Sequence, residues 1–109
     1  MHEQIYARLQ VVARAQRTIT YSEIAPLAGL DMERQEDRDR IAAILDEISR
    51  HEHAEGRPLL SAVVVHKGDG TPGDGFFKMA RSVEVMQASD DRVTFFAREL
   101  GRVHDAWRQ

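Results

Sequence analysis

The most suggestive chemical pattern in this sequence is a literal G-x-G-x-x-G, formed by Gly68, Gly70 and Gly73. A glycine-rich turn between a strand and a helix can bring backbone N–H groups close to a phosphate. A dinucleotide site of that kind also needs a βαβ repeat and an acidic residue at the tip of a second strand, about 20 residues further on, and neither is present. Asp69 and Asp74 would also repel a pyrophosphate. We therefore interpret the loop as a tight turn rather than as a nucleotide site.

Histidines are the second candidates for chemistry. His51 and His53 lie two residues apart on a predicted helix, so they point in nearly opposite directions and cannot share one metal ion. His51 and Glu55 do share a face, but two ligands are too few for a metal site. His66, at the predicted end of a strand, could act as a general base or contact a phosphate. A lone histidine in that position is more often structural.

Nucleophilic catalysis is not indicated. Ser61 lacks the strand-to-helix turn of a nucleophile elbow, and no Ser-His-Asp order is convincing. The chain has no cysteine, which excludes disulfides, thiolate metal sites and cysteine nucleophiles. We expect a protein that is not an enzyme and that has neither a metal site nor a cofactor.

Helices account for most of the chain that would position these residues. Apolar side chains recur at steps of three and four residues, as amphipathic helices require. Thr20 or Ser22 can cap the second helix, and Gly29 and Gly56 can end the second and third. The predicted helices cover residues 3–16, residues 21–28, a long stretch from Glu33 or Glu36 to Glu55, residues 76–87, and a final helix capped by Ser89 or Asp90.

The final helix carries a clear apolar stripe. It consists of Val93, Phe96, Leu100, Val103 and Trp107. Phe95 lies off this stripe, so two alternatives stay open: a homodimer contact through the C-terminal helix, or packing of that helix back onto the first one.

One clear strand is predicted, from Leu59 to His66. Its centre, Val63–Val65, is apolar on both faces, which is typical of a covered strand. Residues 18–20 are β-branched and predict a second, short strand. With 109 residues there is room for one domain, residues 1–109. The expected fold class is α+β, mainly helical.

Composition sets limits on partners and location. The formal net charge is -3 and the isoelectric point about 5.9, whereas a domain that binds duplex DNA usually carries a basic face. The first ten residues are polar and amphipathic, unlike a signal peptide. The longest apolar run, at Ala62–Val65, is too short to span a membrane. We expect a cytoplasmic protein with no membrane partner.

Three consecutive segments resemble a known family. TITYSEIAPLAGL, then RIAAILDEI, then PLLSAVVVHKGDG are similar in order to the winged helix-turn-helix domain of alkylguanine-DNA alkyltransferases and alkyltransferase-like proteins. The resemblance covers roughly residues 17 to 75. The positions that match the family pattern are Thr20, Tyr21, Ile24, Ala25, Ala28, Gly29, Val64, Val65 and Gly70.

The chain departs from that family at its reactive centre. Ser61 stands where the reactive cysteine or its replacement would be, and the flanking proline, histidine and arginine are missing. The recognition-helix arginine falls on Asp39. Alkyl transfer therefore does not carry over. What the resemblance implies is the fold, a winged helix-turn-helix with a short β-sheet and an additional C-terminal helix.

Two functions fit such a fold. In the first, the domain binds nucleic acid, with arginines at the start of the recognition helix and Lys67 in the glycine-rich wing touching the backbone or minor groove. In the second, it is a protein-interaction module. The second is favoured by the segment Asp31–Arg57, which holds nine acidic and five basic residues. We favour the first because it is the commonest use of the fold. The expected contact residues are Tyr21, Arg34, Arg38, Arg40, His66, Lys67, Gly68, Gly70 and Gly73.

Overall fold

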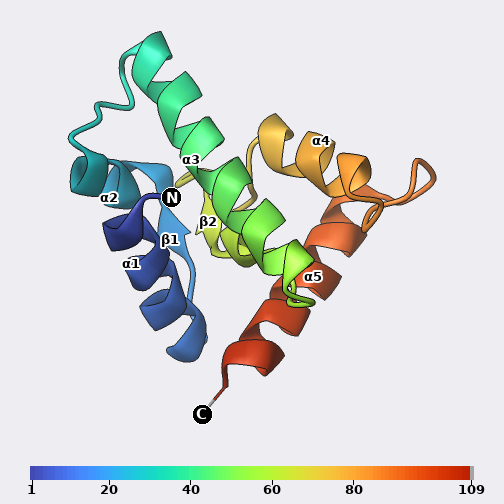
Figure 1. The fold of residues 1–109 in the computed structure, drawn as a ribbon. Helices are drawn as coiled ribbons and strands as arrows, with labels where there is room; N and C mark the ends of the chain where they lie inside the picture. Colours follow the sequence, from blue (N-terminus) through green and yellow to red (C-terminus); the bar gives the residue numbers. More distant parts are fainter. Residues whose placement is uncertain (109) are drawn as a thin grey trace.

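The structure is a computed structural model that describes residues 1–108 (Figure 1), and it is mainly helical with one small sheet. The α+β class expected from the sequence is confirmed. The molecule measures 33 × 32 × 26 Å. In chain order the elements are α1 (Glu3–Arg14), β1 (Ile19–Thr20), α2 (Tyr21–Ile24), the 3₁₀ turn η1 (Ala25–Ala28), α3 (Gln35–Ala54), the 3₁₀ turn η2 (Leu60–Val63), β2 (Val64–Val65), α4 (Asp74–Ser82) and α5 (Arg92–Trp107).

The centre of the molecule is the apolar segment Leu59–Val65. Every residue in it is buried, and η2 packs against α1, α3 and α5 (Figure 1). The strand predicted over Leu59 to His66 is wrong for its first half, which forms η2. Only β2 is extended, and it pairs in parallel with β1. An apolar run that is covered on all sides has no periodicity that separates a strand from a helical turn.

The start of α2 confirms the predicted capping residue. Thr20 Oγ1 accepts a hydrogen bond from the backbone N–H of Glu23 at 3.2 Å, and Glu23 Oε1 accepts one from the N–H of Thr20 at 3.1 Å. This is a capping box, and the hydrogen bonds from Thr20 lower the pKa of Glu23. Gly29 ends η1 with φ of 69°, the left-handed conformation expected of a helix stop. Pro26 splits the predicted helix into one α-helical turn and one 3₁₀ turn.

In α5 most of the predicted stripe is confirmed, because Val103 is buried and Phe96, Leu100 and Trp107 are partly buried against the core, but the centre of the buried face differs from the prediction. The buried residues are Phe95, Glu99 and Val103, while Val93 is 68% exposed. Phe95 packs into the core beside Phe76, with ring centroids 6.2 Å apart, so it offers no outward contact for a homodimer. Helix α5 packs against α1. Of the two alternatives for this helix, packing back onto the first helix is therefore the one that the structure shows.

The segment between α4 and α5 also differs from prediction. Helix α4 ends at Ser82 rather than near Gln87, because the chain reverses there: the backbone N–H groups of Val85 and Met86 both donate to the carbonyl of Ala80. The cap of α5 is Asp91, which accepts from the Thr94 N–H at 3.0 Å, and not Ser89 or Asp90. In residues 1–108 no helix has the length and apolar character needed to cross a bilayer.

The C-terminal turns of α3 contain a buried acid. Glu52 has no exposed surface. It accepts a hydrogen bond from the Tyr6 hydroxyl at 2.7 Å and two from the Arg57 guanidinium, at 2.9 and 2.8 Å. The side chain therefore joins α1, α3 and the segment that enters the core.

Candidate binding site

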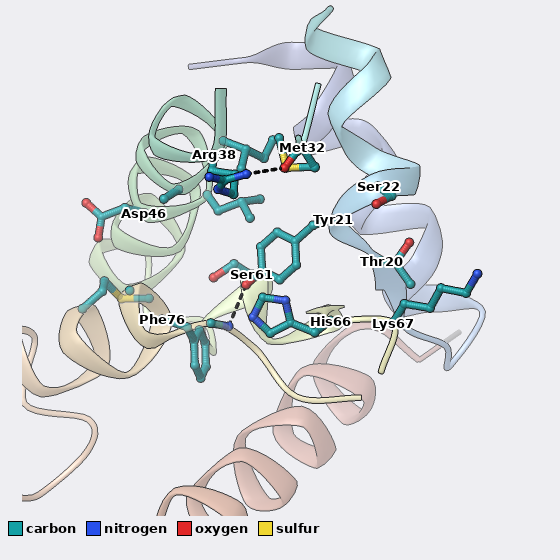
Figure 2. Close-up of a pocket in the computed structure, with 16 residues that line it drawn as sticks. Thr20, Tyr21, Ser22, Met32, Arg38, Asp46, Ser61, His66, Lys67 and Phe76 are labelled. Atoms are coloured by element: carbon teal, nitrogen blue, oxygen red, sulfur yellow. Dashed lines mark hydrogen bonds between the residues drawn. The ribbon is translucent and has the colours of Figure 1, made fainter. Parts of the chain in front are cut away.

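A cavity of about 320 Å³ opens where α3, the start of α2, the loop after β2 and the start of α4 meet (Figure 2). Most of the surface that lines it is apolar, although polar side chains are the more numerous. The apolar residues are Met32, Ile41, Ala42, Leu45, Phe76 and Met79. The polar and charged side chains are Thr20, Tyr21, Ser22, Arg38, Asp46, Ser61, His66 and Lys67.

Buried and exposed residues are separated within this cavity. Ile41, Leu45, Phe76 and Met79 are buried and form its floor together with Ser61. The rim residues are exposed: Ser22, Arg38, Ala42, His66 and Lys67. The site therefore has an apolar interior and a polar, charged opening, which is the usual make-up of a ligand-binding pocket.

Tyr21, His66 and Gly73 form the most tightly built part of the wall. The Tyr21 and His66 rings are in contact, with centroids 4.8 Å apart and planes tilted by 36° (Figure 2), and the Gly73 N–H donates to the Tyr21 hydroxyl at 2.9 Å. A Cβ on Gly73 would lie 3.3 Å from His66 Nε2 and 3.4 Å from the Tyr21 hydroxyl oxygen. Burial raises the pKa of Tyr21, and the hydrogen bond from Gly73 opposes that rise. A side chain at this position would therefore require the His66 ring to shift by a few tenths of an ångström.

Replacing Tyr21 by phenylalanine is expected to destabilise this loop locally. The change leaves the Gly73 N–H without its acceptor, which costs about 1 kcal/mol, so amide exchange at Gly73 should become roughly fivefold faster. Hydrogen exchange followed by NMR measures this rate. Tyr6→Phe, far from the loop, should leave it unchanged. Equal exchange rates at Gly73 in wild type and Tyr21→Phe would show that the hydroxyl does not hold the loop.

Arg38 lies on the α3 side of the opening. It donates to the carbonyl of Met32 at 2.8 Å, drawn as a dashed line in Figure 2, and to Gln35 Oε1 at 2.8 Å. A guanidinium has five N–H donors, so donors remain for a ligand. Lys67 reaches the same cavity from the loop after β2. Asp46 stands eight residues beyond Arg38, about 12 Å further along α3.

The other predicted contact residues are not brought into the cavity lining. Arg34 forms an ion pair with Glu36. Arg40 follows Arg38 by two residues, so it projects to nearly the opposite side of α3. Gly68 and Gly70 lie in the loop after β2, where Gly70 has φ of 68°.

The glycine-rich loop is folded as a compact turn. His66 N–H donates to the Thr71 carbonyl at 2.8 Å, and Gly70 N–H donates to the His66 carbonyl at 3.0 Å. The amide of Gly73 is bonded to Tyr21. The N–H groups of Gly70 and Gly73 therefore have partners inside the chain, which agrees with interpreting this loop as a turn rather than as a phosphate cradle.

Ser61 lies on the floor of the cavity. Its hydroxyl oxygen is 2.6 Å from that of Ser49, which also accepts from the Ser61 N–H at 3.0 Å. A neighbouring serine hydroxyl does not activate a nucleophile as a general base would. Among residues 1–108, no three histidine, aspartate or glutamate side chains are grouped to hold a metal ion.

Sequence reasoning missed several residues of the site. Ala42 and Asp46 follow Arg38 at steps of four along α3, so helical periodicity would have placed them on its face. Nothing in the sequence indicates that Met32, Phe76 or Met79 meets that face, because these contacts join separate elements.

No protein-family model, curated protein or solved structure matches this chain. The fold and the site define a mainly helical α+β domain with an apolar cavity and a charged opening.

Proposed function

We propose that this chain is a non-enzymatic winged-helix domain that binds nucleic acid through α3 and the loop after β2. The observation that supports the proposal is the meeting of Arg38 and Lys67, which are far apart in the sequence, at the opening of one cavity. Both side chains are exposed and cationic. They would contact phosphates, while the Tyr21 and His66 rings in the same cavity wall would meet a sugar or base.

The acidic residues near this surface lower the affinity for nucleic acid but do not exclude binding. Asp37 accepts a hydrogen bond from the Asp31 N–H, and Asp39 accepts one from Gln35. Each of these two carboxylates therefore accepts a hydrogen bond from within the chain. Lys67 lies close enough to Glu23 to help lower the pKa of that carboxyl. We expect weak binding with a strong dependence on salt.

Neutralising both cations is expected to weaken nucleic-acid binding and to reduce its salt dependence. Each lost phosphate contact lowers the slope of log K against log salt by about 0.9 for duplex DNA, so Arg38→Gln/Lys67→Gln should lower it by about 1.8. Fluorescence anisotropy of a labelled duplex, titrated with protein at several salt concentrations, measures the slope.

Arg8→Gln/Arg17→Gln is the matched control, because it removes the same charge from exposed positions outside the cavity. Its slope should equal that of the wild type. If both double variants keep the slope of the wild type, any nucleic-acid binding lies elsewhere on the protein. Absence of binding at micromolar protein in low salt would count against nucleic acid altogether, since even non-specific binders are detected there.

A protein partner is the second candidate, favoured by the apolar floor of the cavity and by Asp46 at its edge. Buried apolar residues flanked by both charge signs suit an apolar side chain of a protein better than a polyanion. Resemblance to the winged helix-turn-helix domain of alkyltransferases supports the nucleic-acid proposal, and the acidic start of α3 supports the alternative. The salt-slope experiment separates the two.

A further inference from the structure

We infer that the cavity between α3, α2 and the loop after β2 is a binding site for a small organic anion with an apolar body. This inference goes beyond the proposed function, because it concerns the interior of the cavity and its test uses no nucleic acid. A volume of about 320 Å³ lies at the lower end of the range for small-molecule sites.

The floor of the cavity determines which part of such a ligand enters first. Ile41, Leu45, Phe76 and Met79 are each less than 10% exposed and come from two separate helices, α3 and α4. An apolar group placed against them is removed from water, which is favourable in proportion to the area covered. A charged group placed there would lose its hydration without a matching partner. The apolar body therefore points inward.

The opening determines the charge of the ligand. Arg38 and Lys67 line it from different elements, and Arg38 keeps donors beyond the two that bind Met32 and Gln35. Asp46 is the one carboxylate in the cavity lining, and in Figure 2 it is drawn on the opposite side of the cavity from Lys67. An anion at the opening is therefore attracted by Arg38 and Lys67 and repelled by Asp46, which favours a ligand orientation with the anionic group away from Asp46.

A matched pair of probes tests the role of the charge. Indole-3-acetate and indole-3-acetamide have the same ring and differ in one charge. Titration of the ¹⁵N-labelled full chain with each, followed by NMR, should shift amides of residues lining the cavity, with the acetate bound about tenfold more tightly at low salt. Arg38→Gln should weaken acetate binding about fivefold and leave acetamide binding unchanged.

Two pairs of variants keep the test decisive. Ala42→Trp fills the opening from an exposed position and should weaken the binding of both probes more than about tenfold. Ala43 is exposed on the same helix but lies outside the lining, so Ala43→Trp should leave the binding of both probes unchanged. Arg38 also donates a hydrogen bond to the Met32 carbonyl, so Arg38→Gln removes more than a charge. Lys67→Gln provides a second charge variant that leaves this hydrogen bond intact. The inference is overturned if neither probe shifts cavity residues, if Ala42→Trp has no effect, or if the preference for acetate survives both charge variants.

Discussion

Replacing Glu52 by alanine is expected to lower the free energy of unfolding by about 3 kcal/mol. The carboxylate is fully buried and accepts hydrogen bonds from Tyr6 and Arg57. Its removal leaves the Tyr6 hydroxyl and the Arg57 guanidinium without their acceptor and opens a space between α1 and α3. Urea unfolding followed by circular dichroism at pH 7 measures the change.

Glu55→Ala is the control, because this glutamate lies one turn further along and is exposed; it should change stability by no more than about 0.5 kcal/mol. The pH dependence gives a second check. Burial alone would raise the pKa of Glu52, but hydrogen bonds from Arg57 and Tyr6 hold it below its usual value. Its contribution is complete above about pH 4.3 and is lost as the pH falls through the lower pKa of the folded state. Glu52→Gln should therefore lose less stability than wild type between pH 7 and pH 3.5, and an equal loss would contradict this assignment.

Local signals in the sequence predicted local structure correctly. The cap at Thr20, one of the two capping residues expected, and the left-handed stop at Gly29 depend only on residues within one or two turns. The long helix is predicted to begin at Glu33 or Glu36 and to end at Glu55, and α3 spans Gln35–Ala54. These features need no knowledge of what the helices pack against.

The errors arise where a distant residue decides the outcome. Glu52 continues the line of Ile41, Leu45 and Ile48 at helical spacing, but a glutamate is rarely fully buried unless it is paired, so the spacing alone does not predict its burial. Its burial depends on Tyr6 in α1 and on Arg57. The centre of the buried face of α5 differs from the prediction for the same reason, since Glu99 occupies it. Hydrophobic periodicity does not detect a buried acid whose partners come from other segments.

The residues of the site could be predicted only in part, since Arg34, Arg40, Gly68 and Gly70 lie outside its lining, and the cavity could not be predicted at all. Tyr21, Arg38, His66, Lys67 and Gly73 were expected to act together, and the structure brings them to one cavity. The volume itself is left between α3 and α4 after their side chains pack, so it depends on the relative position of two helices. No pattern along the chain encodes that position directly.

A second large effect is expected at Glu99, where alanine should lower the free energy of unfolding by about 3 kcal/mol. Glu99 is fully buried in α5 and accepts from the backbone N–H of Leu59 at 2.9 Å and from Arg102 at 2.7 Å. Leu59 is itself fully buried at the start of the central segment. Without the carboxylate its N–H loses its partner away from water, and the junction of α5 with η2 is weakened.

Glutamine at the same position separates the hydrogen bond from the charge. Its amide oxygen can still accept from the Leu59 N–H, while the ion pair with Arg102 is lost; because Arg102 is largely exposed, that loss should cost about 1 kcal/mol or less. Glu99→Gln should therefore recover at least half of the stability that Glu99→Ala loses in urea unfolding. Equal destabilisation by the two variants would mean that the ion pair, rather than the bond to the central segment, holds α5 in place. Slow amide exchange at Leu59 in wild type and Glu99→Gln, with fast exchange in Glu99→Ala, would locate the effect at that N–H group.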